Sequence, residues 1–125
     1  MTKIKVLANC GNSPKNTFVK DFNVAYTKGD IDALGSMVSD EVTWELLGNK
    51  VISGKAEFIK ALEEMKKKEV LECTVETAIS HGKSASASGR MTMSDGDTYA
   101  FADIYEFSST KGNQIKHIKS YIVKV

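Results

Sequence analysis

The chain has little of the residue types that mark covalent, metal or cofactor chemistry. Of its 125 residues only two are cysteine, two are histidine and one is proline. Cys10 and Cys73 are far apart and form no Cys-x-x-Cys pair, so we predict two reduced thiols and no disulfide framework. No set of His, Cys, Asp and Glu has the spacing of metal ligands, and no phosphate loop or nucleophile motif is present. The sequence predicts neither a metal nor a cofactor.

An excess of charge and a long apolar run are also missing. The 17 basic and 16 acidic residues give a net charge of +1, which indicates no nucleic-acid partner and no anionic membrane. No apolar run approaches the roughly 20 residues that span a bilayer. Lys3 and Lys5 precede an apolar run too short for a signal peptide, so we predict a cytoplasmic protein.

Length and composition fit a single globular domain. Hydrophobic residues make up 42% of the chain and charged residues 26%, and 125 residues can bury one sizeable core. We predict an extended N-terminal segment over residues 1–12, followed by one domain over residues 13–125. Ile4, Val6 and Leu7 in the segment can pack against that domain.

The first half of the domain has three helical patterns. Ser13 and Pro14 have the residue types of a helix N-cap and first helical position, Gly29 ends that helix, and Asp30 caps the second. The run Lys66–Lys68 suits the C-terminus of the third. Apolar residues recur at steps of three and four: Phe18, Val19, Phe22, Ala25 and Tyr26, then Ile31, Leu34, Met37 and Val38, then Phe58, Ile59, Leu62 and Met65.

Alternating patterns predict strands. A short strand over residues 42–47 puts Val42, Trp44 and Leu46 on one face, and four consecutive strands joined by short turns follow from Glu69 onward. Helices first and an antiparallel meander afterwards predict an α+β fold. On the first two meander strands the expected inner residues are Leu71, Cys73, Val75, Thr77 and Ile79, and Ala85, Ala87, Gly89, Met91 and Met93.

The most informative strand covers residues 98–107. Read with period two, it puts Asp103 on one face in a row with four aromatic side chains, Tyr99, Phe101, Tyr105 and Phe107. A carboxylate in that position needs a hydrogen-bond donor or takes a raised pKa, and both are typical of a lined cavity. The opposite face is also mostly apolar, so we expect both sides of the strand to be covered.

Several motifs together resemble a known superfamily. They are the run from Asp40 to Glu45, Gly54-Lys55 opening the third helix, and the run from Asp103 to Phe107 before a Gly-containing turn and a last strand. This pattern, over roughly residues 13–124, is similar to the nuclear-transport-factor-2-like superfamily, in its SnoaL-like and ketosteroid-isomerase-like branch. The resemblance implies a cone-like fold, with three N-terminal helices packed on a curved, mainly antiparallel sheet. It also implies an apolar pocket at the wide end and a homodimer through the outer face of the sheet.

The resemblance carries over only one residue of the family's catalytic sets. Ketosteroid isomerase uses an Asp base together with an oxyanion hole of Tyr and protonated Asp. Asp103 matches the protonated Asp, whereas Phe22 stands at the tyrosine position and Leu46 at the base. The limonene-epoxide-hydrolase-like set fails too, because Phe101 stands where its Arg is needed and Ser120 replaces its second Asp. Neither reaction is predicted.

We therefore expect a pocket with Asp103 as its polar anchor and candidate catalytic group. Three functions stay open: binding of a small, mostly apolar molecule; an isomerase or hydro-lyase with Asp103 as general acid; and a dimeric interaction scaffold without ligand. Tyr26, Tyr99, Tyr105 and Tyr121 could each offer a phenol, and Arg90 is expected on the outer face unless a bulge turns it inward. The predicted ligand-binding residues are Phe18, Phe22, Trp44, Leu62, Met91, Tyr99, Phe101, Asp103, Ile118, Ser120 and Ile122.

Overall fold

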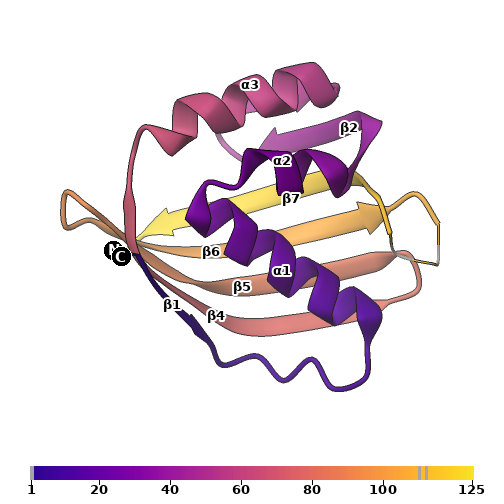
Figure 1. Cartoon of the computed structure of the whole chain (residues 1–125), viewed down its shortest axis with the longest axis horizontal. Coiled ribbons are helices and arrows are strands. Elements are labelled where there is room, and N and C mark those ends of the chain that lie inside the picture. Colours follow the sequence, from indigo (N-terminus) through magenta and orange to yellow (C-terminus); the bar gives the residue numbers. More distant parts are fainter. Residues whose placement is uncertain (1, 110, 112) are drawn as a thin grey trace.

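Three helices cover one face of a curved seven-stranded sheet (Figure 1). The computed structural model describes residues 2–109, 111 and 113–125. The helix α1 lies against β4 and β5, α2 packs between α1 and α3 and touches β2, and α3 lies along β2 and β3. The predicted α+β class and cone-like arrangement are confirmed. Within the described residues, the helices are too short or too polar to cross a membrane.

The helix ends follow the predicted capping residues. The helices are α1 (Pro14–Lys28), α2 (Ile31–Ser36) and α3 (Lys55–Lys66). The Ser13 hydroxyl accepts a hydrogen bond from the Asn16 amide, and Gly29 ends α1 in the left-handed region with φ 71°. The Asp30 carboxylate caps α2. The extension of the second helix to Val38 is wrong, because α2 ends at Ser36 and the fully buried Val38 begins a strand.

The sheet has the strand order β1-β4-β5-β6-β7-β2-β3, and four of its six pairings are antiparallel. The N-terminal segment contributes β1, which pairs in parallel with β4, and β2 pairs in parallel with β7. Its strands are β1 (Lys3–Val6), β2 (Val38–Leu46), β3 (Lys50–Ser53), β4 (Val70–His81), β5 (Ser84–Met93), β6 (Thr98–Phe107) and β7 (Ile115–Lys124).

Two irregularities in β4 correct the predicted inner face of that strand. The register of β4 against β5 shifts between Val70 and Glu72 and again between Val75 and Thr77. Cys73 and Val75 point inward as expected, and Ala78 then takes the next inner position. The three residues predicted to join them are exposed instead: Leu71, Thr77 and Ile79.

Gly89 on β5 allows the Thr74 carbonyl of β4 to approach closely beside the register shift between Val75 and Thr77. A Cβ atom on Gly89 would lie 1.9 Å from the Thr74 carbonyl oxygen and 3.1 Å from the Phe101 ring. No side chain fits between these two groups, so glycine is required where β4 bends over β5. The inner face predicted for β5 is otherwise confirmed, and Arg90 is exposed as its alternation predicts.

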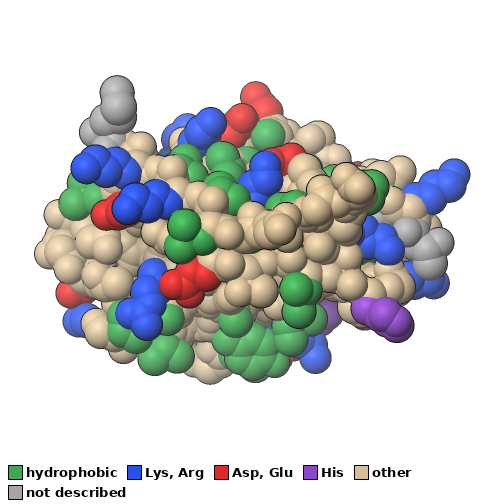
Figure 2. Space-filling view, turned by 90° about the horizontal axis from the view of Figure 1, so that it is seen from below, with side chains coloured by type: hydrophobic (Ala, Val, Ile, Leu, Met, Phe, Trp, Pro, Cys, Tyr) green, Lys and Arg blue, Asp and Glu red, His purple; other side chains and the backbone are tan. Residues whose placement is uncertain are grey.

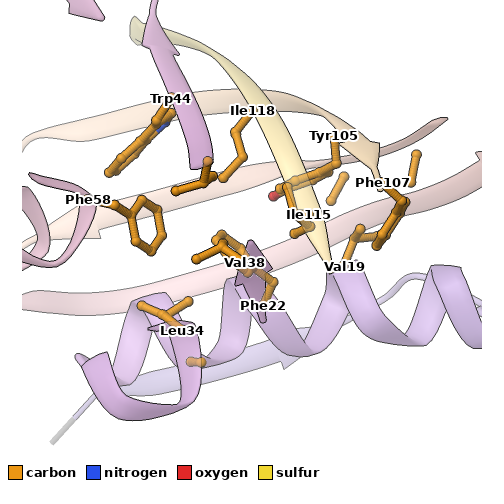
Figure 3. Packing of buried hydrophobic residues seen from close by; sticks show 14 of the residues in the cluster. Val19, Phe22, Leu34, Val38, Trp44, Phe58, Tyr105, Phe107, Ile115 and Ile118 are labelled. Atoms are coloured by element: carbon orange, nitrogen blue, oxygen red, sulfur yellow. The ribbon is translucent and has the colours of Figure 1, made fainter. Parts of the chain in front are cut away.

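The core fills most of the space between the helices and the sheet (Figure 3). Tyr105 and Phe107 from β6 are fully buried, and Phe58 from α3 is 1% exposed. The aromatic rings pack on one another across elements, with centroids 5.5 Å apart for both Phe22–Tyr105 and Trp44–Phe58.

The two faces of β6 differ sharply in burial. The inner face is buried at Phe101, Tyr105 and Phe107, as predicted. On the outer face Ile104 is 45% exposed and Glu106 is exposed, so the single chain does not cover both sides of this strand.

Candidate functional site

Asp103 stands at the centre of a small group of polar side chains on the inner face of the sheet. It is partly buried, and Tyr105 Oη donates a hydrogen bond to its Oδ2 at 3.1 Å. Ser120, its partner on β7, also hydrogen-bonds the carboxylate through its side chain. Asp103 has no ion pair within the described part of the chain. Neutral hydroxyl donors therefore hold this carboxylate.

Both hydroxyl donors are themselves held by a second residue. Asn23 Nδ2 on α1 donates to Tyr105 Oη at 2.9 Å and to the Val19 carbonyl at 2.9 Å. Trp44 Nε1 on β2 donates to Ser120 Oγ at 2.8 Å. The network thus runs from α1 through β6 and β7 to β2. It fixes the hydroxyl oxygens so that their protons point to Asp103.

Burial dominates the ionisation of this group. Desolvation raises the pKa of Asp103 to about 6, although the hydrogen bonds from Ser120 and Tyr105 oppose the shift. Burial, followed by the Asp103 charge, raises the pKa of Tyr105 well above its usual value and also raises that of Tyr26. Burial likewise raises the pKa of the Cys73 thiol. At neutral pH the two phenols and the thiol keep their protons.

The cavity in front of Asp103 is small, about 40 Å³. Ligand pockets usually exceed about 300 Å³, so this one has room for about three water molecules and cannot enclose a ligand by itself. Eight of the predicted binding residues line it: Phe22, Trp44, Met91, Phe101, Asp103, Ile118, Ser120 and Ile122.

Three predicted binding residues lie elsewhere. Phe18 packs its ring against Phe107, with centroids 5.4 Å apart, and belongs to the core. Tyr99 packs against a second, smaller core cluster that contains Cys73 and Phe101. Leu62 is 4% exposed and lines a different hollow. In each case side-chain packing, which the alternation of residues does not describe, decides the position.

Four further residues complete the wall of the cavity: Asn23, Tyr26, Thr27 and Cys73. Among these the sequence had pointed to Tyr26 as a possible phenol donor and to Cys73 as an inner residue. Asn23 and Thr27 were missed, although they follow Val19 at steps of four and so share its face of α1. The signal that could have indicated them is the presence of polar residues on the apolar stripe of the helix.

A larger groove of about 410 Å³ adjoins the cavity. Tyr26 and Thr27 line both hollows and separate them. Tyr26 Oη donates to the sulfur of Met65, at 3.7 Å, which is a weak acceptor. The apolar part of the groove consists of Ile31, Leu34, Leu62, Met65, Val70 and Met93, and its rim carries Lys28, Lys66, Lys67, Lys68 and Glu69.

The site lacks the partners that family-type proton transfer would need. Phe22 lines the cavity and Leu46 is buried in the core, and neither side chain can accept or donate a proton. Asp103 is the cavity's one carboxylate among the described residues. Within the same residues no group of three or more His, Cys, Asp and Glu side chains could hold a metal ion.

Comparison with known proteins assigns the chain to a family. The family model of the SnoaL-like domain matches residues 19–118, which include Asp103 and run from α1 into β7. The chain belongs to the SnoaL-like domain family. No curated protein matches the sequence.

Solved structures share the fold of this SnoaL-like domain. One is an NTF2-like protein of unknown function from Cytophaga hutchinsonii, with 26% identity and a TM-score of 0.65 over 87% of this chain and 99% of that one. Another, of unknown function from Burkholderia xenovorans, has 15% identity and a TM-score of 0.77 over 94% and 88% of the two chains. SalBIII, an epoxide hydrolase/cyclase-like enzyme of pyran ring formation in salinomycin, has 18% identity and a TM-score of 0.73 over 87% and 90%.

Proposed function

We propose that this SnoaL-like domain binds a small, mostly apolar molecule that carries one hydroxyl or similar donor group, with Asp103 as the polar anchor. The observation that supports the proposal is a carboxylate that faces an apolar cavity, is held by two neutral donors and has no cationic partner among the residues that the structure describes. A buried carboxylate has unused acceptor capacity that a ligand hydroxyl can satisfy.

The size of the cavity defines how such a ligand would bind. A cavity of about 40 Å³ accommodates only the polar group of the ligand, which would take the place of water beside Asp103. The apolar body then lies at the mouth, where Met91 is half-buried and Ile122 is 48% exposed. Burying these two side chains would supply the hydrophobic part of the binding free energy.

The structure gives less support to an enzyme of the isomerase or hydro-lyase type. With a pKa of about 6, Asp103 is mostly ionised at neutral pH, so only a minor fraction carries the proton that a general acid donates. The base that such reactions also need has no candidate among the cavity residues, because Tyr26, Tyr105 and Cys73 all have raised pKa values. We therefore favour ligand binding over catalysis as the function of this site.

The test is the affinity of a series of neutral alkyl alcohols, from hexanol to decanol, measured by calorimetry and thermal shift. We expect Asp103→Asn to weaken binding about tenfold, since a hydrogen bond to a charged group is lost. Asp32→Asn is the matched control, because Asp32 is exposed at the start of α2. Equal affinities in the native chain and Asp103→Asn would remove Asp103 from the site, and no binding by any alcohol would reject the proposal.

We also propose a homodimer through the outer face of the sheet. Ile79, Ile104, Tyr121 and Val123 are 42–62% exposed there, and the small residues Ala100 and Ala102 lie between them. Figure 2, a view onto the β1–β4 edge, shows hydrophobic side chains reaching the surface among charged ones. An exposed apolar face of this kind can pack against a second copy.

Light scattering during gel filtration tests the dimer. A lysine at the centre of the face would be buried without a partner, so we expect Ile104→Lys to shift the mass to that of a monomer. Leu7→Lys is the control, because Leu7 is 68% exposed outside this face. A native chain with the mass of a monomer at high concentration would refute the dimer.

A further inference from the structure

The 410 Å³ groove between the C-terminal ends of α1 and α3 has features that the Asp103 site does not use. Figure 1 places both helix ends, together with the connection from α3 to β4, at the same end of the sheet. The volume lies within the range of small-molecule pockets. Its wall is apolar and its rim is basic, which is an arrangement suited to an amphiphile with a negative head group.

The apolar wall comes from four different elements, with Ile31 and Leu34 supplied by α2. Leu62 and Met65 project from α3, Val70 begins β4, and Met93 ends β5. Val70 and Met93 are directly paired in the sheet. Two flexible methionine side chains in such a wall can adapt to an alkyl chain.

The basic rim exceeds what the helix ends require. Each helix C-terminus carries about half a negative charge, so the two ends together offset about one lysine, and Glu69 offsets another. Four lysines line the groove, so its wall residues alone leave about two positive charges, and Glu64 and Asp95, which do not line it, pair with Lys67 and Lys68. An anionic occupant would therefore meet Lys28 and Lys66, the two wall lysines without an ion pair among the described residues.

The lysines differ in their present partners. Lys67 lies 3.0 Å from Glu64 and Lys68 lies 3.7 Å from Asp95, and both pairs are solvent-exposed and correspondingly weak. Lys28 and Lys66 have no ion pair within the described residues. The stem of Lys66 lies against Gly29, over the end of α1.

We propose that this groove is a second binding site, which takes a free monocarboxylate with an alkyl body. The carboxylate pairs with Lys28 and Lys66, and the alkyl chain covers Leu62, Met65 and Met93. The groove shares Tyr26 and Thr27 with the Asp103 cavity, but Asp103 does not line it. The two sites can therefore be tested separately.

Octanoate is the probe and octanol is its neutral counterpart, with affinities measured by calorimetry on the full chain. We expect octanoate to bind the native chain and to bind the double variant Lys28→Gln/Lys66→Gln about tenfold more weakly, whereas octanol affinity does not change. Added salt should weaken octanoate binding to the native chain alone. The matched control is Lys50→Gln/Lys60→Gln, which removes the same charge from positions outside the groove.

Three results would overturn this second site. One is equal loss of octanoate affinity in the control variant, which would make the effect one of net charge. Another is loss of octanoate binding in Asp103→Asn, which would put the probe in the smaller cavity. A third is no binding of octanoate together with cosedimentation with phosphatidylglycerol vesicles, which would reassign the lysines to a membrane surface. If alcohol binding fails while octanoate behaves as expected, the Asp103 proposal fails and the groove stands.

Discussion

The Asp103 cavity and the basic groove share two wall residues, Tyr26 and Thr27, yet their volumes differ about tenfold, 40 Å³ against 410 Å³. Around Asp103, side-chain hydrogen bonds join α1 to β6 and β2 to β7, and Ser120 of β7 also interacts with Asp103 of β6. Across the groove, Tyr26 makes a weak contact with Met65 sulfur. The contrast indicates that a satisfied polar network, and not the curvature of the sheet alone, decides where this cone is filled.

The largest expected effect is a difference in stability between two truncations on α3, one in the core and one beside the groove. Phe58→Ala removes a ring that is 1% exposed and packs on Trp44, so we expect unfolding to become about 3–5 kcal/mol easier. Met65→Ala trims a half-buried side chain beside the groove and should cost about 1 kcal/mol. Urea unfolding of both variants compares them directly. Equal costs would mean that the groove wall is as tightly packed as the core.

The pH dependence of stability reports on the closed cavity. Folding raises the pKa of Asp103 from 3.8 to about 6, so the folded chain holds the proton more tightly than the unfolded chain does. The proton on Asp103 makes its full contribution to the free energy of unfolding below about pH 4. This contribution is lost as the pH rises through about 6, and it amounts to about 3 kcal/mol at most.

Comparison of Asp103→Asn with the native chain isolates this effect from other carboxylates. In urea unfolding, the variant should gain stability relative to the native chain between pH 4 and pH 7.5, because an amide loses no proton. Asp32→Asn should show no such trend. A stability difference that does not vary with pH would mean that water solvates Asp103 well.

The smallest expected effect concerns a single hydroxyl. Tyr105→Phe removes the donor 3.1 Å from Asp103, so the pKa of Asp103 should rise above about 6, and stability should fall by about 1 kcal/mol. Carbon NMR of the carboxyl group measures the pKa. Tyr121→Phe is the control, since Tyr121 is 42% exposed on the other face. An unchanged pKa would show that Ser120 alone holds the carboxylate.

Much of the fold could be predicted because its signals are local. The period-two pattern of residues 98–107 predicted the inner face of β6 correctly, and Ser13, Gly29 and Asp30 marked helix ends where the structure has them. The β4 face was predicted wrongly at Leu71 and again after Val75, and the second shift depends on the contact between Gly89 and Thr74. That contact joins two strands and leaves no trace in the β4 pattern.

The site could be predicted in part only. The position of Asp103 among rings follows from one strand, whereas the volume in front of it depends on residues far apart in the chain. Asn23 and Tyr105 are separated by 82 positions and Trp44 and Ser120 by 76. Periodicity within a strand or helix carries no information about such pairs. The groove was not predicted for the same reason, because the pattern of its lysines indicates only the C-terminus of a helix.

Gly89 has a consequence for any attempt to enlarge the hollow by directed evolution. The Phe101 ring lies over Gly89, and the Thr74 carbonyl blocks the remaining space. In a saturation library we expect every variant at Gly89 to be lost because it does not fold, so none is recovered by selection for ligand binding. Variation that reshapes the hollow must therefore come from its other walls, such as Met91 on the same strand.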